Sequence, residues 1–419
     1  MQHRHRVLGF LSVLSVIMYL DRVCISIAGP RMQEALNLGP DQWGWVTGVF
    51  TLSYAVFEIP SGSMGDRLGP RRVLTRIVLW WSAFTSLTGA VSSYLWLLIV
   101  RFAFGVGEAG AAPNMGVTIA RWFPLQERAR AWGTALMCAQ IGGALAPLLM
   151  VPIQAAYGWR ASFIIFGFTG ILWAAAWYVW FRDSPAEVPG ASAEELALAS
   201  AVPEAHQPLP WSIAVRSRNL WAVVAMAGCV GYSMSFFQSW LGTYLVKARG
   251  FTETGLLFAS LPFIVGALAN LIGGFSGDGL VRKLGLKHGR RTMLVAGYGG
   301  SALSLLVAAQ LDEKFAALAA LSLAYGGITL AQPALMGACL DIGGRFSGAI
   351  TGCMNTAAYG CAFLSSVIYG YLVNHFGNYA VPFIPMIFFM AVGALLGMAV
   401  DAEHPVVPES QLPRPASIV

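Results

Sequence analysis

Long apolar stretches, each followed by a short polar break, run along the whole chain. Each stretch is about 20 residues long, which as an α-helix crosses a ~30 Å hydrocarbon layer. The pattern predicts an all-α membrane protein with twelve transmembrane helices in two pseudo-symmetric sets of six. The predicted spans are 7–29, 44–64, 74–92, 95–119, 131–156 and 160–181, then 219–245, 255–279, 292–310, 315–339, 346–373 and 379–400.

A polar segment rich in Pro, Ala, Ser and Glu separates the two sets. It is too polar and too broken to cross a bilayer, so we interpret it as a linker in which "EELALA" forms a short surface helix. The chain then divides into an N-terminal half (1–182), a cytoplasmic linker (183–218), a C-terminal half (219–400) and a cytoplasmic tail (401–419).

Composition supports the membrane assignment. Of 419 residues, 57% are hydrophobic and 11% are charged, against about 25% charged in soluble domains. The basic amino terminus resembles a signal peptide, but its apolar stretch continues past a charged pair without a cleavage site, so we expect a retained first helix. The six cysteines lie singly in apolar runs and indicate packing thiols, with no metal site.

Basic residues set the orientation. With the amino terminus in the cytoplasm, nineteen of the 26 Lys and Arg fall in inner loops and tails, and five fall in outer loops. By the positive-inside rule, both termini are therefore expected to be cytoplasmic. This bias also explains the net charge of +6, so no nucleic-acid partner is implied.

One loop occurs in both halves. "GSMGDRLGPRR" (62–72) follows the second predicted helix and "GGFSGDGLVRKLGLKHGRR" (273–291) follows the eighth. Parallel six-helix repeats are typical of transporters. We interpret the charged residues of these loops as conformational latches: Asp66, Arg67, Arg71, Arg72, Asp278, Arg290 and Arg291.

Five charges fall inside predicted spans: Asp21, Arg22, Glu58, Arg101 and Glu108. Charges at this depth are costly, so they are expected to face the bundle interior and to pair. At ~1.5 Å rise per residue, Asp21 and Arg101 reach the same depth, which predicts an ion pair that leaves Arg22 to engage an anion. Glu108 lies nearly two turns from Arg101 on the same face. A purely structural ion-pair network is the alternative.

The stretch "RFAFGVGEAG" (101–110) contains G-x-G-x-x-G, the dinucleotide fingerprint. That motif requires a preceding strand within a βαβ unit, whereas here it lies inside an apolar span. We therefore expect Gly105, Gly107 and Gly110 to let a neighbouring helix approach closely, and no nucleotide to bind.

Several motifs carry a family resemblance. The first repeated loop resembles the G-x-x-x-D-R-x-G-x-R-R signature of the major facilitator superfamily. "MYLDRVCISIAG", "RFAFGVGEAGAAPN", "SFFQSWLGTYL" and "GAITGCMNTAAYG" resemble its anion:cation symporter family, which includes bacterial sugar-acid, hexuronate and galactonate transporters and animal organic-anion transporters. The resemblance implies the major facilitator fold over essentially the whole chain.

The resemblance also implies residue roles. Asp21 and Glu108 correspond to proton-coupling carboxylates, Arg22 to the arginine that meets the substrate anion, and Arg101 to the arginine of the charge network. Polar cavity residues that would bind substrate are Tyr54, Gln140, Gln238 and Asn355. Interhelical hydrogen bonding without substrate contact is the alternative for these four.

Glu58 departs from the family, whose members commonly carry glutamine at this point of helix 2. We assign it to the charge network, either as an extra titrating group or, the interpretation we favour, as a locally paired residue near the inner end.

These observations predict a secondary active transporter of the bacterial inner membrane. It would carry a small organic anion, a sugar acid or other carboxylate, by proton-coupled symport, with sodium as the alternative ion, and act as a monomer without cofactor. H-E-x-x-H, G-x-S-x-G and G-x-x-x-x-G-K-[ST] motifs are absent from the sequence, which argues against a membrane enzyme and an ATP-driven pump. A Spinster-like proton-coupled exporter of lysolipids is the alternative, because such proteins also show an Asp-Arg pair in helix 1 and "GVGEA" in helix 4.

Overall fold

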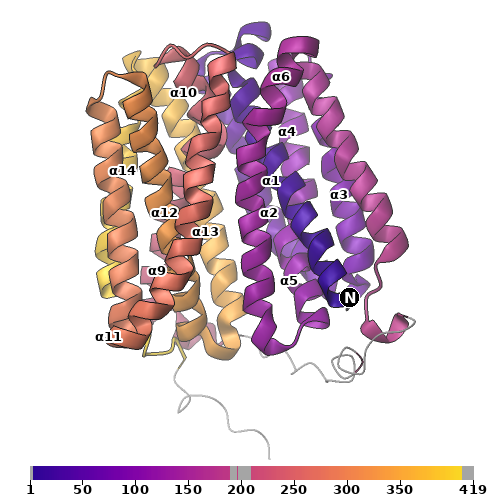
Figure 1. Cartoon of the computed structure of the whole chain (residues 1–419), viewed down its shortest axis with the longest axis vertical. Coiled ribbons are helices and arrows are strands. Elements are labelled where there is room, and N and C mark those ends of the chain that lie inside the picture. Colours follow the sequence, from indigo (N-terminus) through magenta and orange to yellow (C-terminus); the bar gives the residue numbers. More distant parts are fainter. Residues whose placement is uncertain (1–2, 189–195, 197–208, 408–419) are drawn as a thin grey trace, which may run out of the picture.

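The computed structural model describes residues 3–188, 196 and 209–407, and every regular element within these ranges is helical. Figure 1 shows two helical bundles side by side, one from the first half of the sequence and one from the second. The predicted "EELALA" helix lies outside the described residues except for Leu196.

The N-terminal half contains six main helices and a short 3-10 turn after them. They are α1 His3–Ala35, α2 Pro40–Leu68, α3 Pro70–Thr88, α4 Tyr94–Glu108, α5 Ala111–Trp122, α6 Leu125–Trp180 and η1 Pro185–Glu187. The C-terminal half follows the short helix α8 Trp211–Ala214. Its elements are α9 Arg218–Ser235, η2 Phe236–Trp240, α10 Leu241–Lys247, η3 Thr254–Ser260, α11 Leu261–Gln310, α12 Lys314–Gly343, η4 Gly344–Phe346, α13 Ser347–Phe376 and α14 Phe383–Ala399.

Glycines with positive φ make corresponding turns in the two halves. Gly69 (φ 82°) separates α2 from α3, and Gly285 (φ 81°) divides α11 into two helices within the second copy of the repeated loop. Gly158 (φ 81°) divides α6 in the same way, and Gly377 (φ 62°) ends α13. Side chains rarely adopt this backbone conformation, so glycine at these points allows the chain to reverse.

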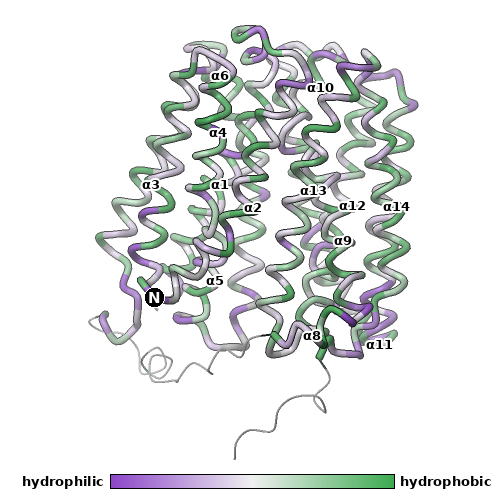
Figure 2. The backbone as a smooth tube through the Cα atoms, turned by 180° about the vertical axis from the view of Figure 1, so that it is seen from behind, coloured by the Kyte–Doolittle hydropathy of each residue, from purple (hydrophilic) through white to green (hydrophobic). Residues whose placement is uncertain are grey.

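The outer surface of the bundle is apolar. Large hydrophobic side chains remain exposed at helical spacing, for example Phe168 and Leu172 on α6 and Ile384 and Phe388 on α14. Figure 2 shows apolar residues along the helices and polar ones gathered at their ends. Such a surface fits a lipid environment rather than water.

Within the described residues, seven helical segments are long and apolar enough to cross a membrane. Two of them, Arg130–Trp180 and Thr254–Gln310, contain 51 and 57 residues, and each includes one of the glycine turns described above. The count of twelve spans stays a prediction.

Two spans differ from the continuous helices that the sequence predicts. The span predicted at 95–119 is interrupted, because α4 ends at Glu108 and α5 begins at Ala111 after Gly110 in the left-handed region (φ 88°). The span predicted at 219–245 contains a π-helical turn, η2. π turns insert one extra residue into a helix and are frequent at functional sites.

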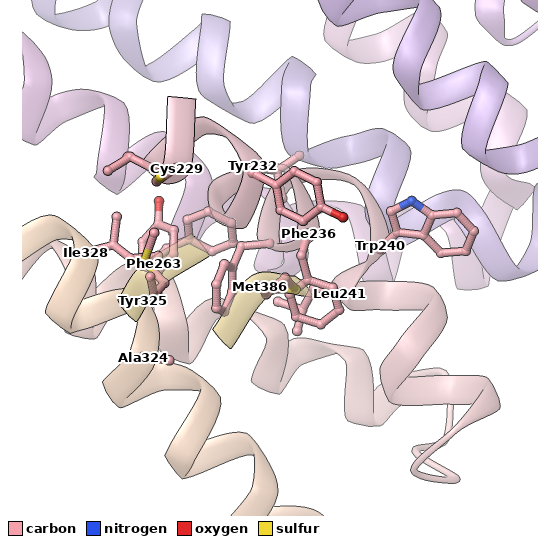
Figure 3. Packing of buried hydrophobic residues seen from close by; sticks show 14 of the residues in the cluster. Cys229, Tyr232, Phe236, Trp240, Leu241, Phe263, Ala324, Tyr325, Ile328 and Met386 are labelled. Atoms are coloured by element: carbon pink, nitrogen blue, oxygen red, sulfur yellow. The ribbon is translucent and has the colours of Figure 1, made fainter. Parts of the chain in front are cut away.

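The halves share a buried core mainly at the end opposite the N-terminus. One cluster includes residues of the N-terminal half at that end, such as Trp43 and Ile25, together with residues of the C-terminal half. Figure 3 shows part of it, where Phe236 and Tyr325 pack among neighbouring helices. The buried members of a second cluster, around Trp177, belong to the N-terminal half, and Tyr359 of the C-terminal half packs against it. The halves are therefore packed together most closely at the end opposite the N-terminus, which we call the outer end.

Candidate functional site

Arg22 and Glu108 form a buried ion pair between α1 and the end of α4. Nε of Arg22 donates to Oε1 of Glu108 at 2.5 Å, and the two side chains are 4% and 1% exposed. The second carboxylate oxygen of Glu108 and Nη2 of Arg22 are buried without a hydrogen-bond partner. The pair therefore has unused hydrogen-bonding capacity in a place where water is scarce.

Aromatic rings surround the guanidinium of Arg22. Nη1 donates to the hydroxyl of Tyr359 on α13 at 3.1 Å, which is a contact between the halves. The carbon at the centre of the guanidinium lies 4.7 Å from the ring centre of Tyr54 and 5.6 Å from those of Tyr19 and Phe50. Such cation–π contacts hold the cation in place while leaving its edge available for an anion.

The predicted pair between Asp21 and Arg101 is wrong. Asp21 lies beside Trp81 and Thr85 of α3, and neither of its oxygens makes a well-formed hydrogen bond in the described structure. The guanidinium carbon of Arg101 lies 4.8 Å and 4.9 Å from the ring centres of Phe50 and Phe104. Helical rise gives the depth of a residue but not the direction it faces, so equal depth did not bring these two side chains into an ion pair.

The sequence analysis favoured a local partner for Glu58, but in the structure its partner belongs to the other half. Its Oε1 accepts a hydrogen bond of 3.0 Å from Nδ2 of Asn355 on α13, and Glu58 is 5% exposed. Tyr54, one turn earlier, packs its ring 4.2 Å from that of Tyr359. Two predicted binding residues, Tyr54 and Asn355, thus lie in the same contact between α2 and α13.

The other two predicted binding residues lie elsewhere in the bundle. Oε1 of Gln140 on α6 accepts a hydrogen bond of 3.0 Å from the hydroxyl of Tyr325 on α12, again between the halves. Gln238 is half-buried in the π turn η2. Sequence analysis missed Tyr325 and Tyr359. Each is a single tyrosine directly before glycine in an apolar run, which is a weak sequence signal. These tyrosines belong to the site because the two halves pack against each other there.

The glycines of "RFAFGVGEAG" permit close packing, as expected. A Cβ atom at Gly105 would overlap Ser53 and the carbonyl group of Phe50, and one at Gly107 would overlap the ring of Trp80. Gly110 also needs its positive φ to separate α4 from α5. This break ends α4 at Glu108, so the carboxylate lies at a helix terminus.

At the outer ends, Arg31 of α1 links three segments. Its Nε donates to Oε1 of Glu253 at 2.6 Å, its Nη2 contacts the other carboxylate oxygen, and its Nη1 contacts the carbonyl group of Gln154 on α6. The guanidinium lowers the pKa of Glu253. Nearby, Gln33 donates to Thr243 at 2.9 Å. We call the Arg31–Glu253 contact the outer clamp.

Among the described residues, basic residues of the two repeated loops contact acids that the sequence analysis did not name. The backbone N–H of Arg71 donates to Asp183 at 2.8 Å, Arg290 pairs with Asp341 at 3.0 Å, and Lys287 pairs with Asp401 at 2.5 Å. The Lys287 ammonium lowers the pKa of Asp401 to about 2.

The remaining predicted latch residues make fewer contacts. Arg291 donates to the carbonyl group of Val400 at 2.6 Å. Arg67, Arg72 and Asp278 are exposed, and the side chain of Asp66 lies outside the described part of the structure.

The fold and the site together define a class. A bundle of two helical halves with an apolar exterior, which holds a buried guanidinium–carboxylate pair where the halves meet, is the architecture of a membrane transporter. Residues 11–365 match the family model described as Major Facilitator Superfamily. The chain belongs to this superfamily and is a transporter, not an enzyme.

Relatives in this superfamily are named for organic anions. The chain is 34% identical to the probable sulfoacetate transporter SauU of Cupriavidus necator, over 94% of this chain and 92% of that protein. It is 29% identical to the probable L-galactonate transporter of Escherichia coli (86% and 81% covered) and 26% identical to the hexuronate transporter of Bacillus subtilis (90% and 90%).

A solved structure shares the fold. A bacterial homologue of the human lysosomal transporter Spinster, in an inward-facing conformation, superposes with a TM-score of 0.77 over 95% of this chain and 96% of the other. At 18% identity, this likeness concerns the fold alone.

Proposed function

We propose that this protein carries a small organic anion across the bacterial inner membrane together with protons, by alternating access. The observation that carries the proposal is the buried Arg22, whose Nη2 has no hydrogen-bond partner while Nε is held by Glu108. A carboxylate or sulfonate group supplies the acceptor that this donor lacks. The relatives named for sulfoacetate, galactonate and hexuronate support the same substrate class.

Protons enter the proposal through Glu108. Its charge competes with a substrate anion for the same guanidinium, because both are acceptors at one buried cation. Protonation of Glu108 removes that competition and frees Nε of Arg22 for the anion. Asp21, which precedes Arg22 on α1, is buried without an ion-pair partner among the described residues. It provides a second proton site. Sodium is the alternative coupling ion.

Transport by alternating access requires contacts between the halves to form at one end while they break at the other. Outer contacts hold the halves together in the described state, with Gly44 of α2 against the backbone of Ser366 and Gly370 of α13 against the carbonyl group of Pro40. Transport would alternate this state with one that is closed at the cytoplasmic end.

We propose the topology predicted from the sequence. Twelve spans form two halves, 1–182 and 219–400, with the linker 183–218 and the tail 401–419 in the cytoplasm. A 51-residue segment would measure about 77 Å as one helix, more than twice the hydrocarbon thickness, so the glycine turns of α6 and α11 make each of these segments cross twice. The cytoplasmic acid–base contacts would act as latches in a monomer.

Reconstitution in liposomes tests the function. With sulfoacetate, L-galactonate, a hexuronate or a lysophospholipid added outside, we expect luminal acidification that requires protein and one of the three acids. The same assay under a sodium gradient distinguishes the coupling ion. Luminal acidification with the lysophospholipid, and with none of the three acids, would contradict the proposed substrate class.

Variants test the residue roles. Asp21→Asn and Glu108→Gln should abolish pH-driven accumulation, and Arg22→Ala should abolish anion binding. Glu34→Gln is the matched control, because Glu34 is an exposed carboxyl on the same helix as Asp21. Accumulation that stays pH-driven in the double variant of Asp21 and Glu108 would show that these carboxyls do not couple protons to transport.

A further inference from the structure

Two layers of contact join α2 to α13 beside Arg22. The two helices are antiparallel, since Pro40 at the start of α2 meets Gly370 near the end of α13. Tyr54 and Glu58 lie one turn apart on α2, and Tyr359 and Asn355 lie one turn apart on α13. Tyr54 therefore packs on Tyr359 in the outer layer, and Glu58 accepts from Asn355 in the inner layer.

Glu58 is a buried carboxyl without a cation of its own. It is 5% exposed, and no Lys or Arg of the described structure forms an ion pair with it. The two arginines of this site are engaged elsewhere, Arg22 with Glu108 and Tyr359, and Arg101 with aromatic rings. An amide donor offsets less of the cost of a buried negative charge than a cation does.

The charges around Glu58 leave an excess of acid. The charged and titratable groups that act on it directly are Arg22 of α1, Tyr54 of α2 and Tyr359 of α13. Glu108 of α4 and Tyr19 of α1 contact the same Arg22. Counting Asp21 and Arg101 as well, the site holds three carboxyls and two guanidiniums. Entry of an anion into this site adds a further negative charge where charge separation is expensive. Uptake of a proton by Glu58 removes one of the two negative charges that are then in excess.

We propose that Glu58 is a third proton-binding carboxyl of the transport site, which adds one proton to the number carried with each anion. This inference rests on the proposed function, since it assumes that an anion and protons move together. It assigns Glu58 a role beyond that of a structural contact between the halves, because the hydrogen bond from Asn355 needs only an acceptor oxygen and not a titrating group.

Glu58→Gln separates the two roles. Glutamine retains the oxygen that accepts from Asn355 and nearly the same volume, but it does not titrate. Asn355→Ala is the complementary variant, because it removes the same hydrogen bond and leaves the carboxyl in place. Glu34→Gln is the control for loss of an exposed carboxyl.

Two measurements follow. Infrared difference spectra of the purified protein between acidic and alkaline pH, without substrate, should show one titrating carboxyl fewer in Glu58→Gln than in the wild type and in Asn355→Ala. Reversal potentials of sulfoacetate transport in proteoliposomes should show one proton fewer per anion in Glu58→Gln, with the wild-type ratio in Asn355→Ala and Glu34→Gln.

An unchanged proton ratio and an unchanged carboxyl count in Glu58→Gln would overturn the role of Glu58 alone. An equal fall of the ratio in Asn355→Ala would also overturn it, because the contact and not the proton would then be responsible. Sulfoacetate transport without any proton movement in the wild type would instead overturn the proposed function, and with it this inference.

Discussion

Glu253→Gln should open the outer end of the protein. The substitution removes the negative charge that Nε and Nη2 of Arg31 contact. It keeps a side chain of similar size. Arg31 and Glu253 are 25% and 51% exposed, so solvent screens their attraction, and exposed ion pairs contribute ~0.2–1 kcal/mol. The two-point geometry favours the upper end of that range. A loss of ~1 kcal/mol shifts the ratio of outer-closed to outer-open molecules by about five-fold.

The prediction includes a pH dependence whose sign follows from the pKa of Glu253. Arg31 lowers this pKa in the outer-closed state, whereas in the outer-open state the carboxyl regains its ordinary value of about 4.3. The clamp therefore contributes fully above about pH 4.3 and loses its contribution as the pH falls through the lowered pKa. Its contribution should also weaken in ~1 M salt, where screening acts over about 3 Å.

Pulsed electron resonance measures the shift. Spin labels at Glu34 and Lys314, exposed residues near the outer ends of α1 and α12, report the separation of the two halves. Asp312→Asn, an exposed carboxyl of the same surface, is the control and should leave the distance distribution unchanged. If Glu253→Gln and the wild type give the same distribution at neutral pH and low salt, the clamp does not stabilise the closed outer end.

Three further predictions concern packing, the site and the ion pair of Asp401 with Lys287. Gly105→Ala should destabilise the protein by ~1–3 kcal/mol in thermal unfolding, because the new Cβ meets backbone of α2, whereas Gly116→Ala in the same span meets no atom and should not destabilise it. Tyr359→Phe removes an acceptor of the buried arginine, so kcat/KM of anion uptake should fall about ten-fold, while Tyr369→Phe on the same helix should leave it unchanged. Asp401→Asn should cost ~0.5–1 kcal/mol at neutral pH. Because the lysine lowers the pKa of Asp401 to about 2, this difference should persist above about pH 4 and vanish as the pH falls toward 2. Equal melting curves for the two glycine variants, equal uptake for the two tyrosine variants, or a pH-independent effect at Asp401 would contradict these expectations.

The helices were predictable because membrane helices carry their signal locally. Apolar length and polar breaks located the main helices to within a few residues, and the repeated loop carries a positive-φ glycine in both copies, Gly69 and Gly285. The break at Gly110 was not predicted, since glycine inside an apolar run indicates close packing and a helix end equally well. Only the packing of α4 against α2 distinguishes the two cases.

The site was predictable by residue type and less so by partner. Arg22 and Glu108 were selected because buried charges are costly, and both lie in the site. Their pairing was missed because helical rise gives depth, whereas a partner depends also on the direction in which each helix face points. Tyr359 was missed for a related reason. A tyrosine in an apolar helix becomes part of a site only through the helix that packs against it.

The packing of the core explains how such a protein can alternate between states. The buried members of the cluster around Trp177 all belong to the N-terminal half, and from the C-terminal half Tyr359 packs against it, so this part can move as one body with most of its own contacts kept. At the outer ends, by contrast, the halves share one core, and their joining contacts are a partly exposed ion pair, a few hydrogen bonds and glycines against backbone. Each of these is weak by itself. An anion and protons at Arg22, where the halves meet, shift the balance between the two states by as much as they bind one state more strongly than the other.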